Sequence, residues 1–143
     1  SAPQIRYPDC YGIDMSKMGD FAAFRAAVEL LKDKGMESLM QDLYVRAVAE
    51  LKKPATEQKC IVQELYEPLT QEEISQKIAD MVKPVGLKAE FNILFQTVEK
   101  LHQACPNDLG DWYFTGNYPT PGGTEVANRA FVYYMEGRKE RAY

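Results

Sequence analysis

The chain has 143 residues, of which 45% are hydrophobic and 27% are charged, and this composition excludes a disordered or low-complexity chain. Its length suits a single domain. Its formal net charge of −4 argues against a nucleic-acid partner, because nucleic-acid-binding domains usually present a basic face.

The three cysteines, Cys10, Cys60 and Cys105, are far apart and form no C-x-x-C pair. This pattern fits a reduced intracellular compartment better than a disulfide framework or a metal site. No apolar run approaches the roughly 18 residues that span a bilayer, and we recognise no signal peptide. We therefore expect a cytoplasmic protein with no membrane partner.

Apolar spacing predicts two helices in the first third of the chain, over residues 20–34 and 37–52. Asp20 is placed to cap the first helix, and Pro54 prevents the second from continuing. The short link around Gly35 predicts an antiparallel helical hairpin. The apolar stripes are Phe21, Phe24, Val28 and Leu31 in the first helix, and Leu39, Leu43, Ala47, Val48 and Leu51 in the second.

The middle of the chain predicts a strand–helix–strand unit. KCIVQELY (residues 59–66) is rich enough in β-branched and aromatic residues for a strand. In LTQEEI, Thr70 and Glu73 have the spacing of a capping box, with Leu69 and Ile74 as a hydrophobic staple, so a helix should run to about Val82. KAEFNILFQ (residues 88–96) alternates like a half-buried strand. The two strands would form a right-handed parallel crossover if adjacent, although the second could equally be an edge.

The last third predicts a short helix from Thr97 to about Gln103, a long loop over residues 104–123, and a final helix. Thr124 would cap the final helix, which should end near Gly137. The predicted fold class is therefore α+β, mainly helical with a small strand–helix–strand unit.

Few residues suggest chemistry of their own. The single histidine, His102, is predicted to be an ordinary surface or partly buried helix residue, because no second ligand stands beside it at metal-binding spacing. Gly122, Gly123 and Thr124 form a candidate anion site, since glycines at a helix start expose N–H groups. A turn followed by an N-cap is the simpler interpretation of the same residues.

A dense cluster of unlike side chains occupies RYPDCYGIDM (residues 6–15). It follows neither a strand nor a helix period, although chain ends are usually polar and frayed. Taken alone, the cluster indicates a segment that packs against something, with Asp14 held in a fixed geometry. No reaction follows from it.

The same cluster carries a family resemblance. SAPQIRYPDCYGIDM (residues 1–15) resembles the segment that glutamine phosphoribosylpyrophosphate (PRPP) amidotransferases carry shortly after their PRPP-binding loop. FTGNYP (residues 114–119) resembles a second motif of that family, and the stretch between them is more weakly similar to the extended C-terminus of a bacterial subgroup. In the first segment, the matching residues are Ser1, Pro3, Pro8, Tyr11, Gly12, Ile13 and Asp14.

The resemblance implies that this chain is the C-terminal portion of a larger phosphoribosyltransferase-type enzyme. Residues 1–16 would be the tail of the phosphoribosyltransferase domain, and residues 17–143 a C-terminal α+β domain. The family transfers ammonia from glutamine to PRPP, which gives phosphoribosylamine and opens purine biosynthesis. The family's catalytic cysteine and PRPP loop do not occur in these 143 residues, so we expect the chain alone to be inactive.

The resemblance also implies roles for the segment from Tyr11 to Met15. Tyr11, Ile13 and Met15 would wall the route that ammonia takes between domains, Gly12 would permit a tight turn, and Asp14 would meet a polar group of the other domain. The implied partners are the chain's own upstream glutaminase and phosphoribosyltransferase domains, and a homo-oligomer. Mg²⁺ is expected in the full-length family, with no cofactor in this portion.

Some family members hold an iron–sulfur cluster, and here this sequence departs from the family. The cluster cysteines align with Asp9, Asn107, Gly110 and Tyr113, while Cys10 is displaced by one position and Cys105 does not match. Because thiolates are the usual cluster ligands, we expect no cluster.

Two other interpretations compete with the enzyme portion. The chain could be a stand-alone helical interaction module that presents an apolar stripe of residues 20–52 to a partner. A weaker alternative is regulatory nucleotide binding at Gly122 and Gly123.

Overall fold

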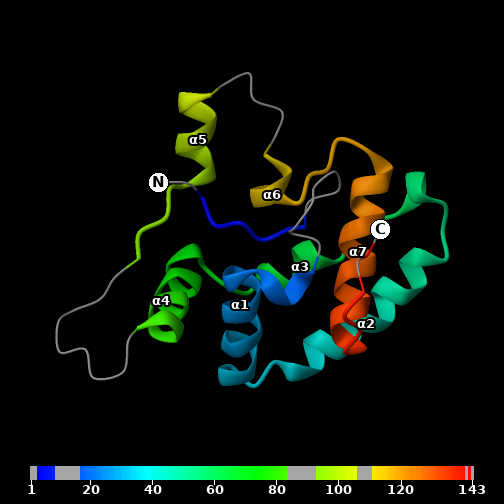
Figure 1. Ribbon diagram of the computed structural model, residues 1–143, viewed down its shortest axis with the longest axis horizontal. Coiled ribbons are helices and arrows are strands. Elements are labelled where there is room, and N and C mark those ends of the chain that lie inside the picture. The colour runs from blue at the N-terminus through cyan, green and yellow to red at the C-terminus, as the bar shows by residue number, and fades with distance from the viewer. Residues whose placement is uncertain (1–2, 9–16, 84–92, 106–110, 141, 143) are drawn as a thin grey trace.

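The computed structural model describes residues 3–8, 17–83, 93–105, 111–140 and 142 (Figure 1). Helices make up 65% of these residues, and no strand occurs among them. The predicted α+β class and its strand–helix–strand unit are therefore wrong for the described chain, which is helical. The elements are η1 (Met18–Asp20), α1 (Ala22–Asp33), α2 (Glu37–Leu51), η2 (Ala55–Glu57), α3 (Val62–Tyr66), α4 (Gln71–Val82), α5 (Val98–Ala104), α6 (Trp112–Thr115) and α7 (Pro121–Met135).

The two predicted N-terminal helices are confirmed as α1 and α2, but they do not form a hairpin. Helix α1 packs chiefly against α4, and α2 packs against α7, so the two diverge from their link (Figure 1). Gly35 makes this link possible with a φ of +69°, a conformation that is unstrained only for glycine. Asp20 does not cap α1, because it lies in η1 and the N-cap position belongs to Phe21.

The segment predicted as the first strand forms helix α3 instead. The side chain of Asn128 on α7 satisfies backbone groups just before this helix: its Oδ1 accepts from the N–H of Ile61 (3.0 Å), and its Nδ2 donates to the carbonyl of Lys59 (2.8 Å). Val62, Leu65 and Tyr66 are buried at helical spacing. Because these backbone groups have partners on α7, the segment needs no neighbouring strand. The burial of its apolar side chains as a helix outweighs its β-propensity.

The capping box that begins α4 is confirmed. Thr70 Oγ1 accepts from the N–H of Glu73 (3.1 Å), and Glu73 Oε1 accepts from the N–H of Thr70 (3.3 Å). Leu69 and Ile74 are both buried in the core, as a hydrophobic staple requires. The helix ends at Val82, also as predicted.

The C-terminal third departs from prediction at two places. Residues 93–96 form no strand, while residues 88–92 of that predicted strand lie outside the described part of the chain. The predicted long loop contains α6, and α7 begins at Pro121 with Thr120, not Thr124, as its N-cap. Helix α5 is confirmed, with Thr97 accepting from the N–H of Lys100 (3.1 Å).

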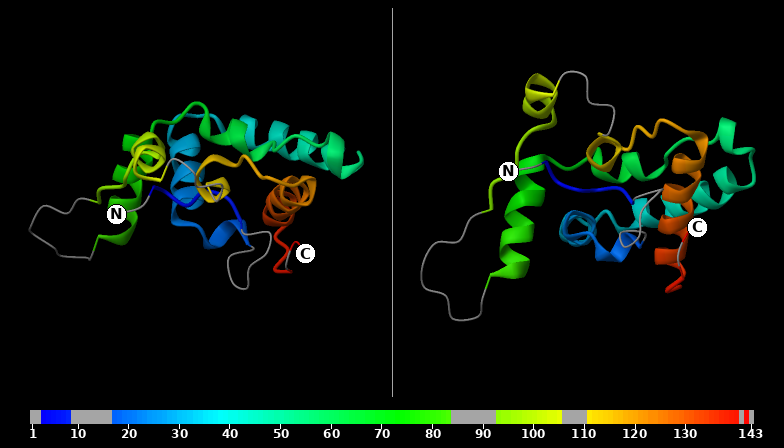
Figure 2. Two further views of the ribbon diagram at one scale, coloured as in Figure 1. Left: turned by 90° about the horizontal axis from the view of Figure 1, so that it is seen from above. Right: turned by 45° about the horizontal axis from the view of Figure 1, so that its top comes forward.

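The core lies where α1 meets α4 on one side and α7 on the other. Phe24 of α1 makes edge-to-face contacts with Phe131 and Tyr134 of α7, at centroid distances of 6.3 and 4.8 Å. Residues 3–8 run from the α4 side of the molecule toward α7, as the views in Figures 1 and 2 agree. Tyr7 in this segment is 3% exposed, so the segment is part of the core.

Candidate functional site

The two segments that carry the family resemblance lie in contact. The backbone N–H groups of Arg6 and Tyr7 both donate to the carbonyl of Tyr113, the residue just before the second segment, at 2.9 and 3.2 Å. The hydroxyl of Tyr118 donates to the carbonyl of Pro8 (2.7 Å). Residues 6–8 and 113–118, which are more than a hundred positions apart, therefore form one junction.

Gly116 shapes this junction. Its φ of +76° lies in the left-handed region, and a Cβ built on it would come within 2.8 Å of the Tyr7 ring. Glycine is therefore required here by both backbone conformation and packing. Gln63 of α3 holds the same turn, because its Nε2 donates to the carbonyl of Thr115 (2.8 Å) and to Oδ1 of Asn117 (2.9 Å).

Beneath the junction lie the buried Tyr7 and Tyr66 and the half-buried Cys60. The two tyrosine rings meet edge to face at 5.6 Å, and the hydroxyl of Tyr66 donates to the carbonyl of Arg6 (3.0 Å). Burial raises the pKa of both tyrosines above the usual value, and it raises the pKa of the Cys60 thiol to about 12. All three side chains are therefore neutral near pH 7, and they act as packing groups rather than as nucleophiles or bases.

Gln4 is a key residue that sequence reasoning missed. It is 3% exposed, and its Nε2 donates to the carbonyl of Gln71 (3.0 Å) and to Oγ of Ser75 (2.8 Å), both on α4. Its Oε1 accepts from Nε (3.1 Å) and Nη2 (2.7 Å) of Arg6. Gln4 thus joins the N-terminal segment to α4. No sequence pattern marks it, because its partners are brought together only by the fold.

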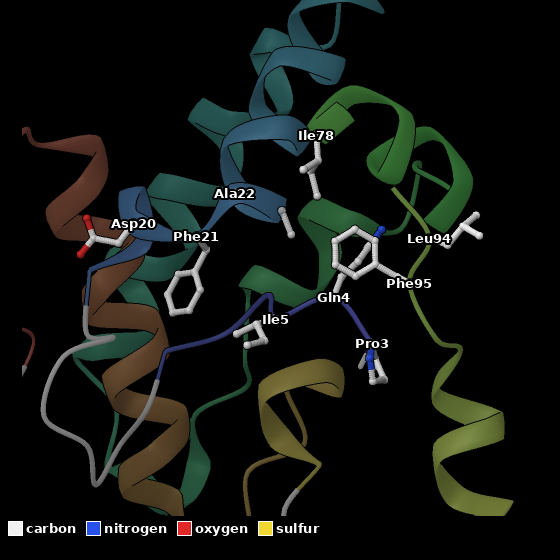
Figure 3. Close-up of a pocket in the computed structure, with 10 residues that line it drawn as sticks. Pro3, Gln4, Ile5, Asp20, Phe21, Ala22, Ile78, Leu94 and Phe95 are labelled. Carbon is white, nitrogen blue, oxygen red and sulfur yellow. The ribbon is translucent and has the colours of Figure 1, made fainter. Parts of the chain in front are cut away.

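An apolar pocket opens beside Gln4, with a volume of about 450 Å³ (Figure 3). Figure 3 shows Ile5, Ile78 and Phe95, from three separate segments, around it, while Leu94 points away at its edge. The volume falls within the range of ligand pockets. Its lining consists of Pro3, Gln4, Ile5, Asp20, Phe21, Ala22, Ala23, Ile78, Leu94 and Phe95.

The candidate anion residues Gly122, Gly123 and Thr124 lie in the first turn of α7. The N–H of Gly123 is already used, since Thr120 Oγ1 accepts from it at 3.4 Å. A Cβ on Gly123 would lie 2.5 Å from the Tyr118 ring, whereas one on Gly122 would meet nothing within 4 Å. Close packing against Tyr118 explains why a glycine is needed at position 123. Anion binding at this turn stays a prediction.

The other predicted site residues fall elsewhere. Tyr11, Gly12, Ile13, Asp14 and Met15 lie outside the described residues, as do the aligned positions Asp9, Asn107 and Gly110 and the displaced Cys10. The remaining aligned position, Tyr113, belongs to α6, where its ring stacks on Trp112 at 5.1 Å.

His102 is exposed on α5, as predicted, with Nε2 at 2.9 Å from Oδ2 of Asp111. Within the described ranges, no group of three or more His, Cys, Asp or Glu side chains is arranged to hold a metal ion. None of the described helices combines the length and the apolar character that crossing a membrane requires.

The rival interaction module would present an apolar stripe on residues 20–52. In the structure, Val45 of α2 is the one large hydrophobic side chain of α1 and α2 that is exposed, at 58%. The remaining stripe is buried or half-buried against α4 and α7.

Comparisons of this chain with known protein families, curated proteins and solved structures found no match. The family resemblance consequently depends on the two motifs themselves.

Proposed function

We propose that this chain is the C-terminal portion of an amidophosphoribosyltransferase, the enzyme that forms phosphoribosylamine from glutamine and PRPP at the first step of purine biosynthesis. Residues 1–15 and 114–119 carry the resemblance. The cytoplasm is the proposed location, in keeping with three cysteines that form no C-x-x-C pair.

The contact between the two motif segments is the observation that supports this proposal most. Two motifs of one family that meet in space form one structural unit, whereas chance matches have no reason to touch. Here the Tyr118 hydroxyl donates to the Pro8 carbonyl at 2.7 Å, and Gly116 lies so close to the Tyr7 ring that a Cβ on it would come within 2.8 Å.

The proposed role of this portion is to position, not to catalyse. Residues 6–8 are anchored to α3 and α6, and the chain continues from Pro8 into Tyr11–Met15 only three residues later. The proposed role of this anchor is to position the start of the apolar wall of the ammonia route. The buried Tyr7 and Tyr66 and the half-buried Cys60 support it as neutral groups.

The test begins with the gene sequence upstream of Ser1. A hydrophobic strand that ends in two acidic residues, followed by a glycine-containing loop, is expected there. A start codon directly before Ser1 would refute the proposal.

The second arm is an assay of phosphoribosylamine formation from glutamine, PRPP and Mg²⁺. The longer polypeptide should be active and the 143-residue chain inactive. Turnover by the chain alone would contradict the positioning role, and an inactive longer polypeptide would contradict the enzyme assignment.

A further inference from the structure

We propose that the apolar pocket and the side chains around it form the surface on which the part of the phosphoribosyltransferase domain that would precede Ser1 in the same polypeptide docks. This inference rests on the proposed function, which supplies that domain. The docking face, as we call it, consists of Ile5, Ile78, Met81, Val82, Leu94 and Phe95.

The exposed apolar side chains of the described residues gather at this face. Five large hydrophobic side chains are exposed among the described residues; four of them belong to this face, and Val45 on α2 is the one that lies elsewhere. Ile5 and Leu94 line the pocket, and Leu94 is 85% exposed. Met81 and Val82 follow Ile78 by three and four positions on α4, which places them on the same side of that helix. Contiguous exposed apolar surface of this kind marks an interaction site.

The path of the chain identifies the occupant. Pro3, Gln4 and Ile5 line the pocket, and Pro3 is only two residues from Ser1. Since each residue spans at most about 3.6 Å, a domain joined to Ser1 must begin within roughly 7 Å of Pro3. A tethered domain therefore meets this face at a high effective concentration, which favours it over a free second copy of the chain.

The chemistry of the walls favours a protein surface over a charged metabolite. Among the described lining residues there is no Lys, Arg or His that could bind a phosphate, and the only charged one is Asp20. The amide of Gln4 is engaged with Gln71, Ser75 and Arg6, so it is not available to orient a ligand. Small-molecule pockets depend on a few such polar groups for specificity. An apolar protein surface needs none of them.

Thiol labelling tests the docking face directly. Leu94→Cys places a reporter on the face, and Val45→Cys, also at an exposed hydrophobic position, is its matched control on α2. Both are made in a Cys10→Ser, Cys60→Ala, Cys105→Ser background, because Cys60 is only half-buried and would also take up label. Each variant is labelled with a maleimide, once in the 143-residue chain and once in the longer polypeptide.

In the 143-residue chain, the two reporters should react at similar rates. In the longer polypeptide, the reporter at position 94 should react at least about tenfold more slowly, because labelling then requires transient opening, while the control at position 45 should not change.

Three results would overturn the proposal. Equal labelling at both positions of the longer polypeptide would show that the face stays open. Protection in the 143-residue chain that grows with its concentration would assign the face to a second copy. Concentration-independent protection in that chain would mean that the chain itself, or a bound apolar molecule, covers the face.

The labelling rate and the formation of phosphoribosylamine are separate readouts. An active longer polypeptide with an unprotected position 94 would overturn the docking face and leave the proposed function standing. An inactive polypeptide with a protected position would do the reverse, leaving a docked upstream domain of another activity.

Discussion

The hydroxyl of Tyr118 lies 2.7 Å from the carbonyl oxygen of Pro8, although the two residues are 110 positions apart in the chain. This hydrogen bond closes the junction between residues 6–8 and 113–118. Pro8 is three positions before Tyr11 in the sequence, so this bond holds the described chain just ahead of the segment to which the proposed function gives a role.

Removing this hydroxyl should weaken the junction. Tyr118→Phe keeps the ring that packs against Gly123 but leaves the part-buried Pro8 carbonyl without its donor, so we expect a loss of about 0.5–1.5 kcal/mol in the free energy of unfolding. Urea denaturation measures it. Tyr44→Phe is the matched control, because the Tyr44 hydroxyl bonds to Glu136 at the exposed surface and should matter less. Equal losses in the two variants would contradict the prediction.

The neighbouring glycines at the start of α7 should respond in opposite directions to the same substitution. Gly123→Ala would put a Cβ 2.5 Å from the Tyr118 ring, and such overpacking costs about 1–3 kcal/mol. Gly122→Ala meets nothing within 4 Å, and alanine is the better helix former by up to about 1 kcal/mol. Thermal or urea unfolding of both variants checks this. Destabilisation by Gly122→Ala, or tolerance of Gly123→Ala, would be inconsistent with the packing described.

Asn128 should be among the most sensitive polar positions. It is fully buried, and Asn128→Ala leaves the N–H of Ile61 and the carbonyl of Lys59 without these partners. Buried unpaired groups cost about 1–3 kcal/mol each, so the loss should be at least about 2 kcal/mol. Asn117→Ala provides a control, because Asn117 is exposed and accepts one bond from Gln63. A cost for Asn128→Ala no larger than that of the control would rule out this role.

Acid should destabilise the fold partly through Glu50. Its carboxylate accepts from Nζ of Lys53 (2.8 Å) and from the N–H of Lys59 (3.1 Å), with the Lys53 bond as the larger cause, and its pKa is lowered below the usual 4.5. A lowered pKa in the folded state means that the stabilisation is complete above 4.5 and is lost as the pH falls through the folded-state value. The urea midpoint should therefore fall with pH below about 4.5 less steeply in Glu50→Gln than in the unmodified chain. Parallel pH profiles would exclude this contribution.

The sequence alone was sufficient to predict the helices whose signals are local. The apolar spacing of α1 and α2, and the Thr70–Glu73 capping box that begins α4, predicted elements that the structure contains, because these patterns act within one or two turns of chain. Local signals also misplaced the start of α7. The prediction placed the N-cap at Thr124, whereas the helix begins after Thr120, and Gly123 in its first turn packs against Tyr118.

Contacts between distant residues decided the rest. KCIVQELY has the composition of a strand, yet it forms α3, because Asn128 on α7 satisfies the backbone on both sides of Cys60. The pocket, the place of Gln4 and the junction of the two motif segments likewise depend on partners far apart in the sequence, such as Gln4 and Gln71, which are 67 positions apart. Sequence patterns reveal local backbone preferences and the spacing of apolar residues. Contacts between distant residues form only in the folded chain, because local preferences are compatible with many different packing arrangements.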